Sequence, residues 1–246
     1  MKEVILEKFK LTQKDVKRGL KLPEEMTPKL AYICGILAGD GSIYKREIKH
    51  DYIIKCVGNP KDEKELYFEV IEPIFRELFG LQLKIKYHDS NTTFGFAIYS
   101  KTLFRYLTEI IELPSGKKYD SLKIPPKFDD ENKLLINFIR GVFDTDGCIS
   151  FKRRKKDKPY YPVISLSSKS KRFTTELASK LKELGFKITE LYDYKVIDKR
   201  TEQGFTIINR IDMNGDENLK KWITIIGFSS PKHINKIKEI KPWLLK

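Results

Sequence analysis

The sequence predicts an α+β protein made of two similar half-domains. Three observations lead to this prediction: one pattern of residues occurs twice, each copy alternates helical and strand-like segments, and 40% of the residues are hydrophobic. This apolar content is enough to offset the entropy lost on folding, so a disordered basic chain is excluded. The length of 246 residues fits one large domain or two modest ones.

Two apolar segments, each ending in an acid and a glycine, carry the repeat. Residues 32–43 (YICGILAGDGSI) align with residues 138–149 (FIRGVFDTDGCI) at a constant offset of 106. Solenoid units recur every 20 to 50 residues, so a doubled domain is the better interpretation. Weaker similarity downstream has offsets near 105 and later of 116, which predicts an insertion in the second copy at 198–204.

We expect half-domains at residues 1–113 and 128–246, joined by a linker at 114–127. The linker contains Pro114, Gly116 and the pair Pro125 and Pro126. Proline and glycine prevent a continuous helix through this stretch. The boundary between the copies is therefore predicted here.

Each copy is predicted to run helix, two strands, helix, two strands, helix. Thr27 and Pro28 begin the first helix, which ends at Asp40. Asp129 or Asp130 is expected to cap its counterpart in copy two. Period-two alternation predicts the strands and amphipathic spacing predicts the intervening helices. The predicted ranges are 42–49, 52–57, 62–79, 83–87 and 94–99 in copy one, and 149–154, 160–167, 170–184, 187–196 and 204–213 in copy two.

The chain is strongly basic, with 48 Lys and Arg against 34 Asp and Glu, a formal net charge of +14. Such a surface favours a polyanion and argues against a generic enzyme of small metabolites. No run of eighteen apolar residues and no signal peptide occurs, so we expect no membrane partner and a cytoplasmic location, or an organellar one in a eukaryote. Three scattered cysteines and three histidines exclude zinc-finger spacing and a disulfide framework.

The repeat places Asp40 and Asp146 at matching helix ends. If a pseudo-twofold axis relates the copies, these carboxylates lie side by side, and Gly35 and Gly141 let the helix backbones approach closely. Mg²⁺ binds carboxylates together with substrate phosphate oxygens, and such sites hydrolyse phosphodiesters. An Asp-Gly pair also simply ends many helices in a tight turn. Recurrence at a constant offset in a basic protein favours the metal site.

Residues 33–41 (ICGILAGDG) and 139–147 (IRGVFDTDG) resemble the two nine-residue signatures of the LAGLIDADG homing endonucleases, in the single-chain form with both half-domains. The resemblance covers nearly the whole chain, because the order of strands and helices also fits. It implies two pseudo-twofold-related αββαββα half-domains whose antiparallel sheets form a DNA-binding saddle. It further implies a monomer that uses Mg²⁺, or another divalent cation such as Mn²⁺, to break both strands of a long double-stranded DNA target site.

The resemblance assigns metal binding to Asp40 and Asp146, with the backbone carbonyl groups of Gly39 and Thr145 as further ligands. Copy two keeps an acid, Asp144, at the first acidic position of the signature, where we expect a helix-end interaction. Copy one departs from the pattern with Ala38 at that position. The position is not a metal ligand in the family, so catalysis is not put in doubt.

The family also has a basic or polar residue at the end of the second strand of each half. In copy two this implies a catalytic role for Lys169, beside Ser168, in stabilising charge or orienting water. The alignment slips in copy one, where Asn59 and Lys61 both stay open as counterparts.

Outward-facing basic and polar side chains on the strands are the candidates for DNA contact, because a two-stranded ribbon fits the major groove. In copy one these candidates are Tyr44, Lys45, Arg46, Lys49, Lys84 and Lys86. In copy two they are Lys152, Arg153, Arg154, Lys155, Lys156, Lys158, Lys195, Lys199, Arg200 and Arg210. The run at 152–158 is predicted to lie in a turn, which favours phosphate contact over base readout.

Two rival functions remain. An RNA-splicing maturase, or another non-cleaving nucleic-acid-binding protein on the same fold, could retain both acids. An intein needs a nucleophile at its start and a His-Asn pair at its end, whereas this sequence starts with Met1 and ends in PWLLK. We therefore expect a free-standing, intron-encoded endonuclease.

Overall fold

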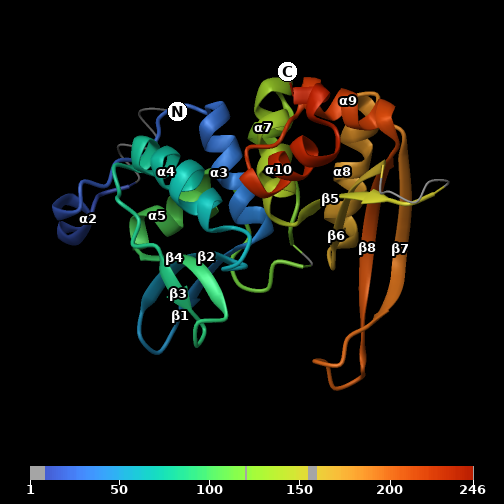
Figure 1. The fold of residues 1–246 in the computed structure, drawn as a ribbon. Coiled ribbons are helices and arrows are strands. Elements are labelled where there is room, and N and C mark those ends of the chain that lie inside the picture. Colours follow the sequence, from blue (N-terminus) through green and yellow to red (C-terminus); the bar gives the residue numbers. More distant parts are fainter. Residues whose placement is uncertain (1–8, 120, 155–159, 246) are drawn as a thin grey trace.

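The computed structural model describes residues 9–119, 121–154 and 160–245. Two four-stranded antiparallel sheets have the same strand order, β1-β2-β4-β3 in the first half and β5-β6-β8-β7 in the second. Helices lie between and above the sheets, and the hairpins β1–β2, β3–β4 and β7–β8 project from the lower side of the molecule in Figure 1. The predicted α+β fold with two related half-domains is confirmed.

The first half begins its repeat with α3 (Pro28–Gly39), where the Thr27 side chain accepts a hydrogen bond from the Leu30 N–H. Gly80, with φ of 68°, ends the helical segment before the second hairpin because glycine tolerates this left-handed conformation. The elements that follow α3 are β1 (Gly41–Arg46), β2 (Asp51–Gly58), η1 (Leu66–Ile71), α4 (Glu72–Phe79), β3 (Lys86–His88), β4 (Thr93–Tyr99), α5 (Lys101–Arg105) and η2 (Tyr106–Ile110).

The second half repeats this order. Its elements are α6 (Pro126–Asp129), α7 (Asn132–Thr145), β5 (Gly147–Lys152), β6 (Tyr161–Ser168), α8 (Lys171–Glu183), β7 (Ile188–Ile197), β8 (Phe205–Asn214) and α9 (Asp216–Ile225). The insertion predicted at 198–204 lies in the turn of a hairpin whose two strands are ten residues long. This hairpin reaches well beyond the rest of its sheet (Figure 1).

The predicted cap of α7 by Asp129 or Asp130 is wrong. The residue before α7 is Glu131, which makes no side-chain capping hydrogen bond. Pro126 instead starts the separate short helix α6, which takes up Asp129, and this carboxylate pairs with the Lys180 ammonium at 2.9 Å. The predicted half-domain boundaries at 114–127 stay a prediction.

Helical segments outside the repeat were not predicted. The segment α2 (Gln13–Lys17) precedes the first signature helix, and α10 (Pro231–Ile240) and η3 (Pro242–Leu245) follow α9. In Figure 1, α2 flanks the first sheet, and α10 lies in front of the central helices. Arg18 at the end of α2 contacts the Tyr99 carbonyl of the first sheet, and Lys232 of α10 contacts Glu63.

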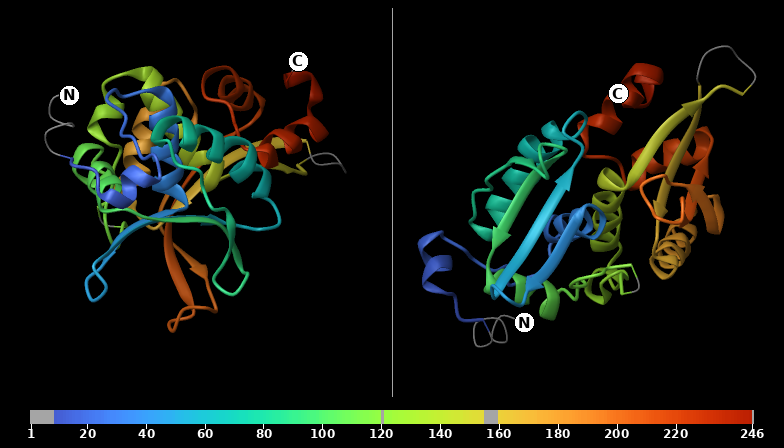
Figure 2. Two further views of the ribbon diagram at one scale, coloured as in Figure 1. Left: turned by 90° about the vertical axis from the view of Figure 1, so that its left-hand side faces the viewer. Right: turned by 90° about the horizontal axis from the view of Figure 1, so that it is seen from below.

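The halves are joined by α3 and α7, which lie between the two sheets when the molecule is seen from below (Figure 2, right). A Cβ atom at Gly35 would lie 2.1 Å from the Phe138 carbonyl oxygen, and one at Gly141 would lie 2.2 Å from the Tyr32 carbonyl oxygen. The predicted close approach of the helix backbones is therefore confirmed. It fixes the two sheets relative to each other.

Acidification is expected to destabilise the fold through His233 of α10. This ring is buried against Phe228, with 4.6 Å between the ring centroids. Burial lowers the pKa of His233 to about 3, and the charges of Lys232 and Lys236 add to the effect. Because the unfolded chain binds the proton near pH 6.5, the free energy of unfolding should fall as the pH drops through this value, by about 2 kcal/mol between pH 7 and pH 5.

Urea titrations of the parent and of His233→Gln at several pH values measure this effect. The variant should lose less stability than the parent over this interval. His50→Gln, in the exposed turn after β1, is the control and should follow the parent. The prediction would be contradicted if the free energy of unfolding changed with pH equally in the parent and in His233→Gln.

Candidate active site between the two half-domains

Asp40 and Asp146 are the C-cap residues that directly follow α3 and α7. Their backbone N–H groups close the helices by bonding to the carbonyl groups of Ile36 (3.1 Å) and Val142 (3.0 Å). The next residue is glycine in both copies, and a Cβ there would lie 2.3 to 2.4 Å from the carbonyl oxygen four residues earlier. The chain therefore passes directly from helix to strand only with glycine, which explains the repeated Asp-Gly pair.

The two helix ends meet. A Cβ at Gly39 would lie 2.1 Å from Thr145 Oγ1 and 3.6 Å from Asp146 Cγ. Since Gly35 also faces Gly141, α3 and α7 run parallel and end side by side. All four metal-binding groups implied by the family resemblance are thus at one junction.

The carboxylates at this junction are buried and repel one another. Burial raises the pKa of Asp40 to about 8, and the carboxylates of Asp146 and Glu63 raise it further. The Asp146 side chain reaches solvent but is surrounded by protein on its other sides, and this desolvation raises its pKa as well. Lys118 and Lys232 act in the opposite direction on both carboxylates.

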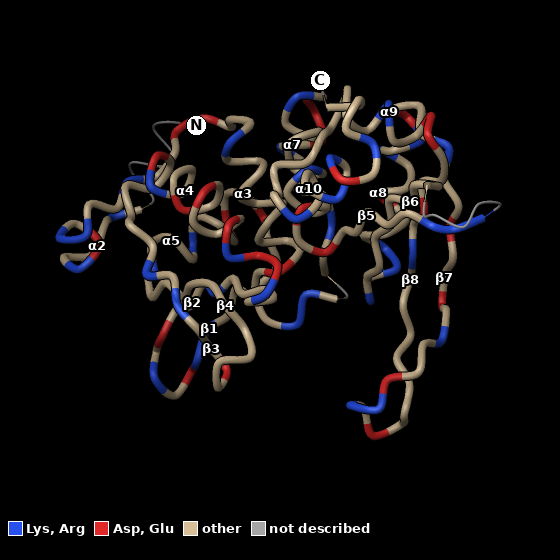
Figure 3. The backbone as a smooth tube through the Cα atoms, viewed as in Figure 1, with Lys and Arg blue, Asp and Glu red and all other residues tan. Residues whose placement is uncertain are grey.

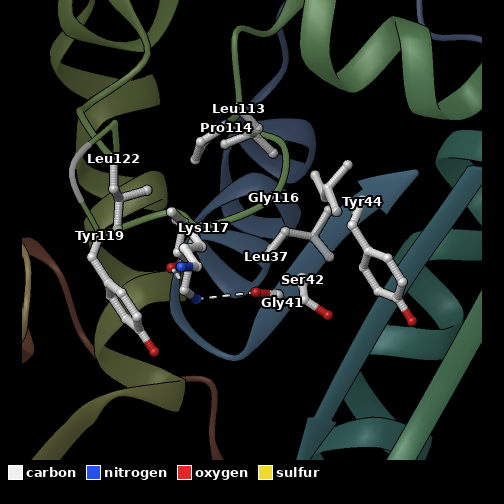
Figure 4. A pocket seen from close by; sticks show the side chains of 13 residues that line it. Leu37, Gly41, Ser42, Tyr44, Leu113, Pro114, Gly116, Lys117, Tyr119 and Leu122 are labelled. Atoms are coloured by element: carbon white, nitrogen blue, oxygen red, sulfur yellow. Dashed lines mark hydrogen bonds between the residues drawn. The ribbon is translucent and has the colours of Figure 1, made fainter. Parts of the chain in front are cut away.

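Lys118 comes from the predicted linker and holds the end of α3. Its ammonium donates to the carbonyl groups of Ala38 and Gly41, at 3.0 Å each, and also to that of Gly39. A hollow of about 430 Å³ lies beside this contact, between the linker and the start of β1. Figure 4 shows its lining, with Leu37, Leu113 and Leu122 as the apolar part and Tyr44 and Tyr119 carrying hydroxyl groups.

Lys232 comes from the first turn of α10 and meets a third acid. Its ammonium lies 2.6 Å from Glu63 Oε1, and both side chains are largely buried. Glu63 Oε2 accepts a hydrogen bond of 2.7 Å from the Asn59 N–H. The junction therefore holds three carboxylates and two ammonium groups.

The two lysines follow similar turns in the two halves, beyond the aligned repeat. Glu112 (φ 67°) after η2 and Gly227 (φ 71°) after α9 both adopt a left-handed conformation, and they lie six and five residues before Lys118 and Lys232. Sequence reasoning missed both lysines because they lie outside the signatures. The matching stretches Leu113-Pro114-Ser115 and Phe228-Ser229-Ser230 were the available signal.

The second half of the chain matches a known family model. Residues 133–227 fit the model described as a LAGLIDADG-like domain. The second half therefore contains a LAGLIDADG-like domain. The first half has the same strand order and carries the first copy of the internal repeat.

Two curated archaeal proteins resemble this LAGLIDADG protein over most of its length. Both are from Methanocaldococcus jannaschii: a glutamine–fructose-6-phosphate aminotransferase, 25% identical over 90% of the chain, and a probable translation initiation factor IF-2, 27% identical over 89%. The chain spans only 18% and 17% of these relatives. Because the activities named for these two relatives differ, the shared region cannot account for both.

Solved structures share the fold of the LAGLIDADG protein. I-DmoI in complex with DNA and Ca is 18% identical, with a TM-score of 0.58, covering 88% of this chain and all of I-DmoI. A variant of I-SmaMI is 13% identical, with a TM-score of 0.53, covering 89% of this chain and 93% of that one. Among the described residues of the LAGLIDADG protein, no helix is long and apolar enough to cross a membrane.

Lys169 does not join the two acids. Its ammonium lies 5.4 Å from the centre of the Tyr119 ring, whereas Lys118 and Lys232 are the lysines with the main effect on the pKa values of Asp40 and Asp146. Gly41 pairs with Cys56 and Gly147 pairs with Leu166, so the strand register makes Asn59, rather than Lys61, the counterpart of Lys169. A catalytic role for Lys169 stays a prediction for this LAGLIDADG protein.

Asp144 joins the two halves of the LAGLIDADG protein instead of only ending a helix. It is fully buried and accepts hydrogen bonds from the Tyr32 hydroxyl (2.8 Å) and the Ser229 N–H (3.0 Å to Oδ2). Burial raises the pKa of Asp144 to about 6, although these donors oppose the rise.

Tyr32→Phe is expected to destabilise the LAGLIDADG protein by about 2 kcal/mol, because it removes a donor from a buried carboxylate. The matched control is Tyr106→Phe, whose hydroxyl donates to the neutral Pro23 carbonyl at 2.9 Å and should cost about 1 kcal/mol. Urea denaturation at pH 7.5 measures both. If Tyr32→Phe lowers the free energy of unfolding no more than Tyr106→Phe does, the Tyr32 hydroxyl does not donate to a charged carboxylate.

The DNA-contact candidates of the first half of the LAGLIDADG protein fall on different surfaces. Tyr44 and Arg46 lie on the outer face of the sheet, and Lys84 and Lys86 line a hollow on that face. Lys45 pairs with Tyr52 on the opposite face and lies over the Tyr52 ring. Lys49 lies in the exposed turn between β1 and β2.

The candidates of the second half are also divided. Lys152 and Arg210 lie on the outer face, and Arg210 pairs with Asp212 at 2.8 Å. Arg153 follows β5 in an exposed position, and Arg154 stacks on Tyr161 at 3.7 Å. Lys195 pairs with Ile207 on the other face, while Lys199 and Arg200 lie in the hairpin turn. Lys155, Lys156 and Lys158 lie outside the described residues.

The chemistry of the junction fits a divalent cation. No cluster of three or more His, Cys, Asp or Glu side chains with metal-binding geometry occurs among the described residues. Asp40 and Asp146 nevertheless offer two carboxylate groups as hard oxygen donors, and their pKa values are raised first by burial and then by neighbouring carboxylates. Mg²⁺ takes one or two carboxylates and completes its shell with water and phosphate oxygens, so the LAGLIDADG protein supplies a sufficient donor set.

Proposed function

We propose that this LAGLIDADG protein is a DNA endonuclease that hydrolyses one phosphodiester bond in each strand of a long target site, with Mg²⁺ or Mn²⁺. One observation carries the proposal: Asp40 and Asp146 lie at adjoining helix ends in a protein of net charge +14. Paired carboxylates weaken phosphate binding unless a cation lies between them and the phosphate.

The residues of the site have separate roles in this proposal. Asp40 and Asp146 hold the cation, which when bound acts as a Lewis acid and generates a nucleophile from water. Lys118 and Lys232 place an ammonium group beside the carboxylates from each half, where they can stabilise negative charge developing on a phosphate. One lysine from each half fits one cleavage in each strand.

The two sheets are the proposed DNA-binding surface. Their outer faces carry Tyr44, Arg46, Lys152 and Arg210, and both sheets flank the helices that end in the acids. The homing endonuclease I-DmoI has been solved with DNA and Ca and with DNA and Mn, which supports duplex DNA and a divalent cation as partners here. We propose a monomer, because one chain supplies both halves.

The comparisons also support a mobile coding element. Similarity to two proteins of different activity, over less than a fifth of each, is expected of a module that does not contribute to the activity of its host. We infer that the gene is intron-encoded or inserted in a host gene. The alternative, an RNA-splicing maturase on this fold, predicts tight RNA binding without cleavage of DNA.

Cleavage of a plasmid library with a randomised insert tests the function. We expect linear plasmids with Mg²⁺, none with EDTA, and a common sequence among the cleaved inserts. Binding to duplex DNA without cleavage in Mg²⁺, Mn²⁺ or Ca²⁺ would refute the endonuclease, and preferential binding of structured RNA would support the maturase.

The two lysines should act in cleavage and not in DNA binding. Lys118→Met and Lys232→Met are each expected to slow cleavage about 100-fold, because each removes a positive charge from the reaction centre. Strand-resolved nicking assays should show that the two variants slow different strands. Lys117→Met, at the neighbouring position, is the control and should keep the parent rate. Equal slowing of both strands by both variants would argue against one lysine per strand.

A further inference from the structure

A second basic surface lies at the outer end of the first sheet. A hollow of about 670 Å³ is bounded by the outer face of this sheet and by α2. Its lining includes Lys14, Arg18, Lys55, Lys84 and Lys86, and no Asp or Glu lines the hollow within the described part of the chain. Figure 3 marks Lys and Arg along α2 beside the sheet.

The hollow exists because the edge strand is short. β3 pairs with β4 over Lys86–His88, so Ala97 to Tyr99 of β4 have no strand partner on that side among the described residues. In the second half, β7 pairs with β8 along nearly its whole length. Residues 81–85 diverge from β4, and α2 faces the gap that results.

α2 is fixed in this position by a buried acid. Asp15 is 1% exposed and accepts hydrogen bonds from the hydroxyl groups of Thr12 (2.7 Å) and Thr102 (3.0 Å). Arg18 donates to Asp15 and to the Tyr99 carbonyl at 3.1 Å. These contacts tie α2 to the end of β4 and leave the Lys14 and Lys17 side chains exposed.

The hollow is remote from the two acids. β1 starts next to Asp40 and runs outward to Arg46, and Tyr44, which lines the hollow, pairs through Ile53 with Tyr99 at the outer end of β4. Four strand residues span about 13 Å. A duplex centred on Asp40 and Asp146 and lying along the outer face would reach this end of the sheet.

We propose that α2 and the hollow form a binding site for the sugar-phosphate backbone of duplex DNA, at the end of the target site contacted by the first half. The inference rests on the proposed function. Lys14 and Lys84 would neutralise phosphates, since no described acid pairs with either, whereas Lys55 pairs with Asp89 at 2.8 Å. The second half contacts its end of the site with the long β7–β8 hairpin, so the two halves reach outward by different means.

Lysine acetylation with and without a 30-bp random-sequence duplex, in EDTA and low salt, tests the proposal on the unmodified protein. Mass spectrometry should show Lys14 protected several-fold, together with Lys86 on the sheet, while Lys220 on α9 keeps its reactivity. Acetylation of Lys14 at an unchanged rate while Lys86 is protected would overturn the inference and leave the proposed function standing. Protection of no lysine would reject DNA binding itself. Stronger protection of Lys14 by single-stranded RNA would overturn the assignment to DNA.

Charge reversal gives an independent measurement. Lys14→Glu should reduce the magnitude of the slope of log K against log salt by about 0.9, because one phosphate contact is lost. Lys220→Glu makes the same change in charge on α9 and should leave the slope unchanged. Equal slopes for the two variants would refute contact at α2.

Discussion

Replacing Asp40 or Asp146 with asparagine will reduce double-strand cleavage at least about 1,000-fold without unfolding the protein. The amide keeps the shape of the side chain but removes the negative charge that holds a divalent cation. Initial cleavage rates on a selected target plasmid in Mg²⁺ measure the loss. Glu217→Gln on α9, an exposed acid remote from the junction, is the control and should keep the parent rate.

The same Asp40→Asn change should stabilise the protein when EDTA removes divalent cations. The pKa of Asp40 is about 8 in the folded protein against 3.8 for an ordinary aspartate, so folding takes up a proton between these pH values. The free energy of unfolding therefore falls as the pH rises from about 4 to about 8, and Asp40→Asn removes this part of the fall. Added Mg²⁺ should stabilise the parent more than the variant. Destabilisation by Asp40→Asn in EDTA would contradict the description of the site.

Gly141→Ala will destabilise the fold by about 3 kcal/mol. The added methyl group would lie 2.2 Å from the Tyr32 carbonyl oxygen and 2.8 Å from the Ile36 nitrogen, so the helices must separate. Backbone atoms cannot move aside as a flexible side chain can. Thermal and urea unfolding measure the loss, and Gly35→Ala should behave alike.

Gly204→Ala is the matched control for this prediction. Gly204 lies in the turn between β7 and β8 with φ of 73°, and no atom of the described residues lies within 4 Å of an added Cβ. Alanine there costs only about 1 kcal/mol of backbone strain. If Gly141→Ala costs no more than Gly204→Ala, the close approach of α3 and α7 is refuted.

The repeat made the centre of the fold predictable from the sequence. A constant offset of 106 aligned Gly35 with Gly141 and Asp40 with Asp146, and these pairs meet at the helix interface and at its end. A pseudo-twofold arrangement places equal positions near the axis, so sequence identity there translates directly into proximity. The insertion at 198–204 was predictable for the same reason, because the offset changes across it.

The rest of the site depends on contacts that the offset does not encode. Glu63 has no acidic counterpart in the second half. When the two halves are aligned by their strand register, the position equivalent to Glu63 is the buried Phe173. Lys232 reaches the junction only because α10 folds back after the repeat has ended. Lys169 matched the family position in sequence, but its side chain extends to Tyr119. Local sequence patterns do not determine where these side chains and helices lie in the tertiary structure.

The hydrogen bond between Tyr32 and Asp144 also determines which half pairs with which. The position equivalent to Tyr32 in the second half is Phe138, and the position equivalent to Asp144 in the first half is Ala38. If two first halves of different chains associated through this interface, both tyrosine hydroxyls would be buried opposite alanine. If two second halves associated, both aspartates would be buried opposite phenylalanine, with no hydroxyl donor. Only the pairing of unlike halves satisfies the carboxylate and the hydroxyl, so this interface disfavours exchange of half-domains between chains.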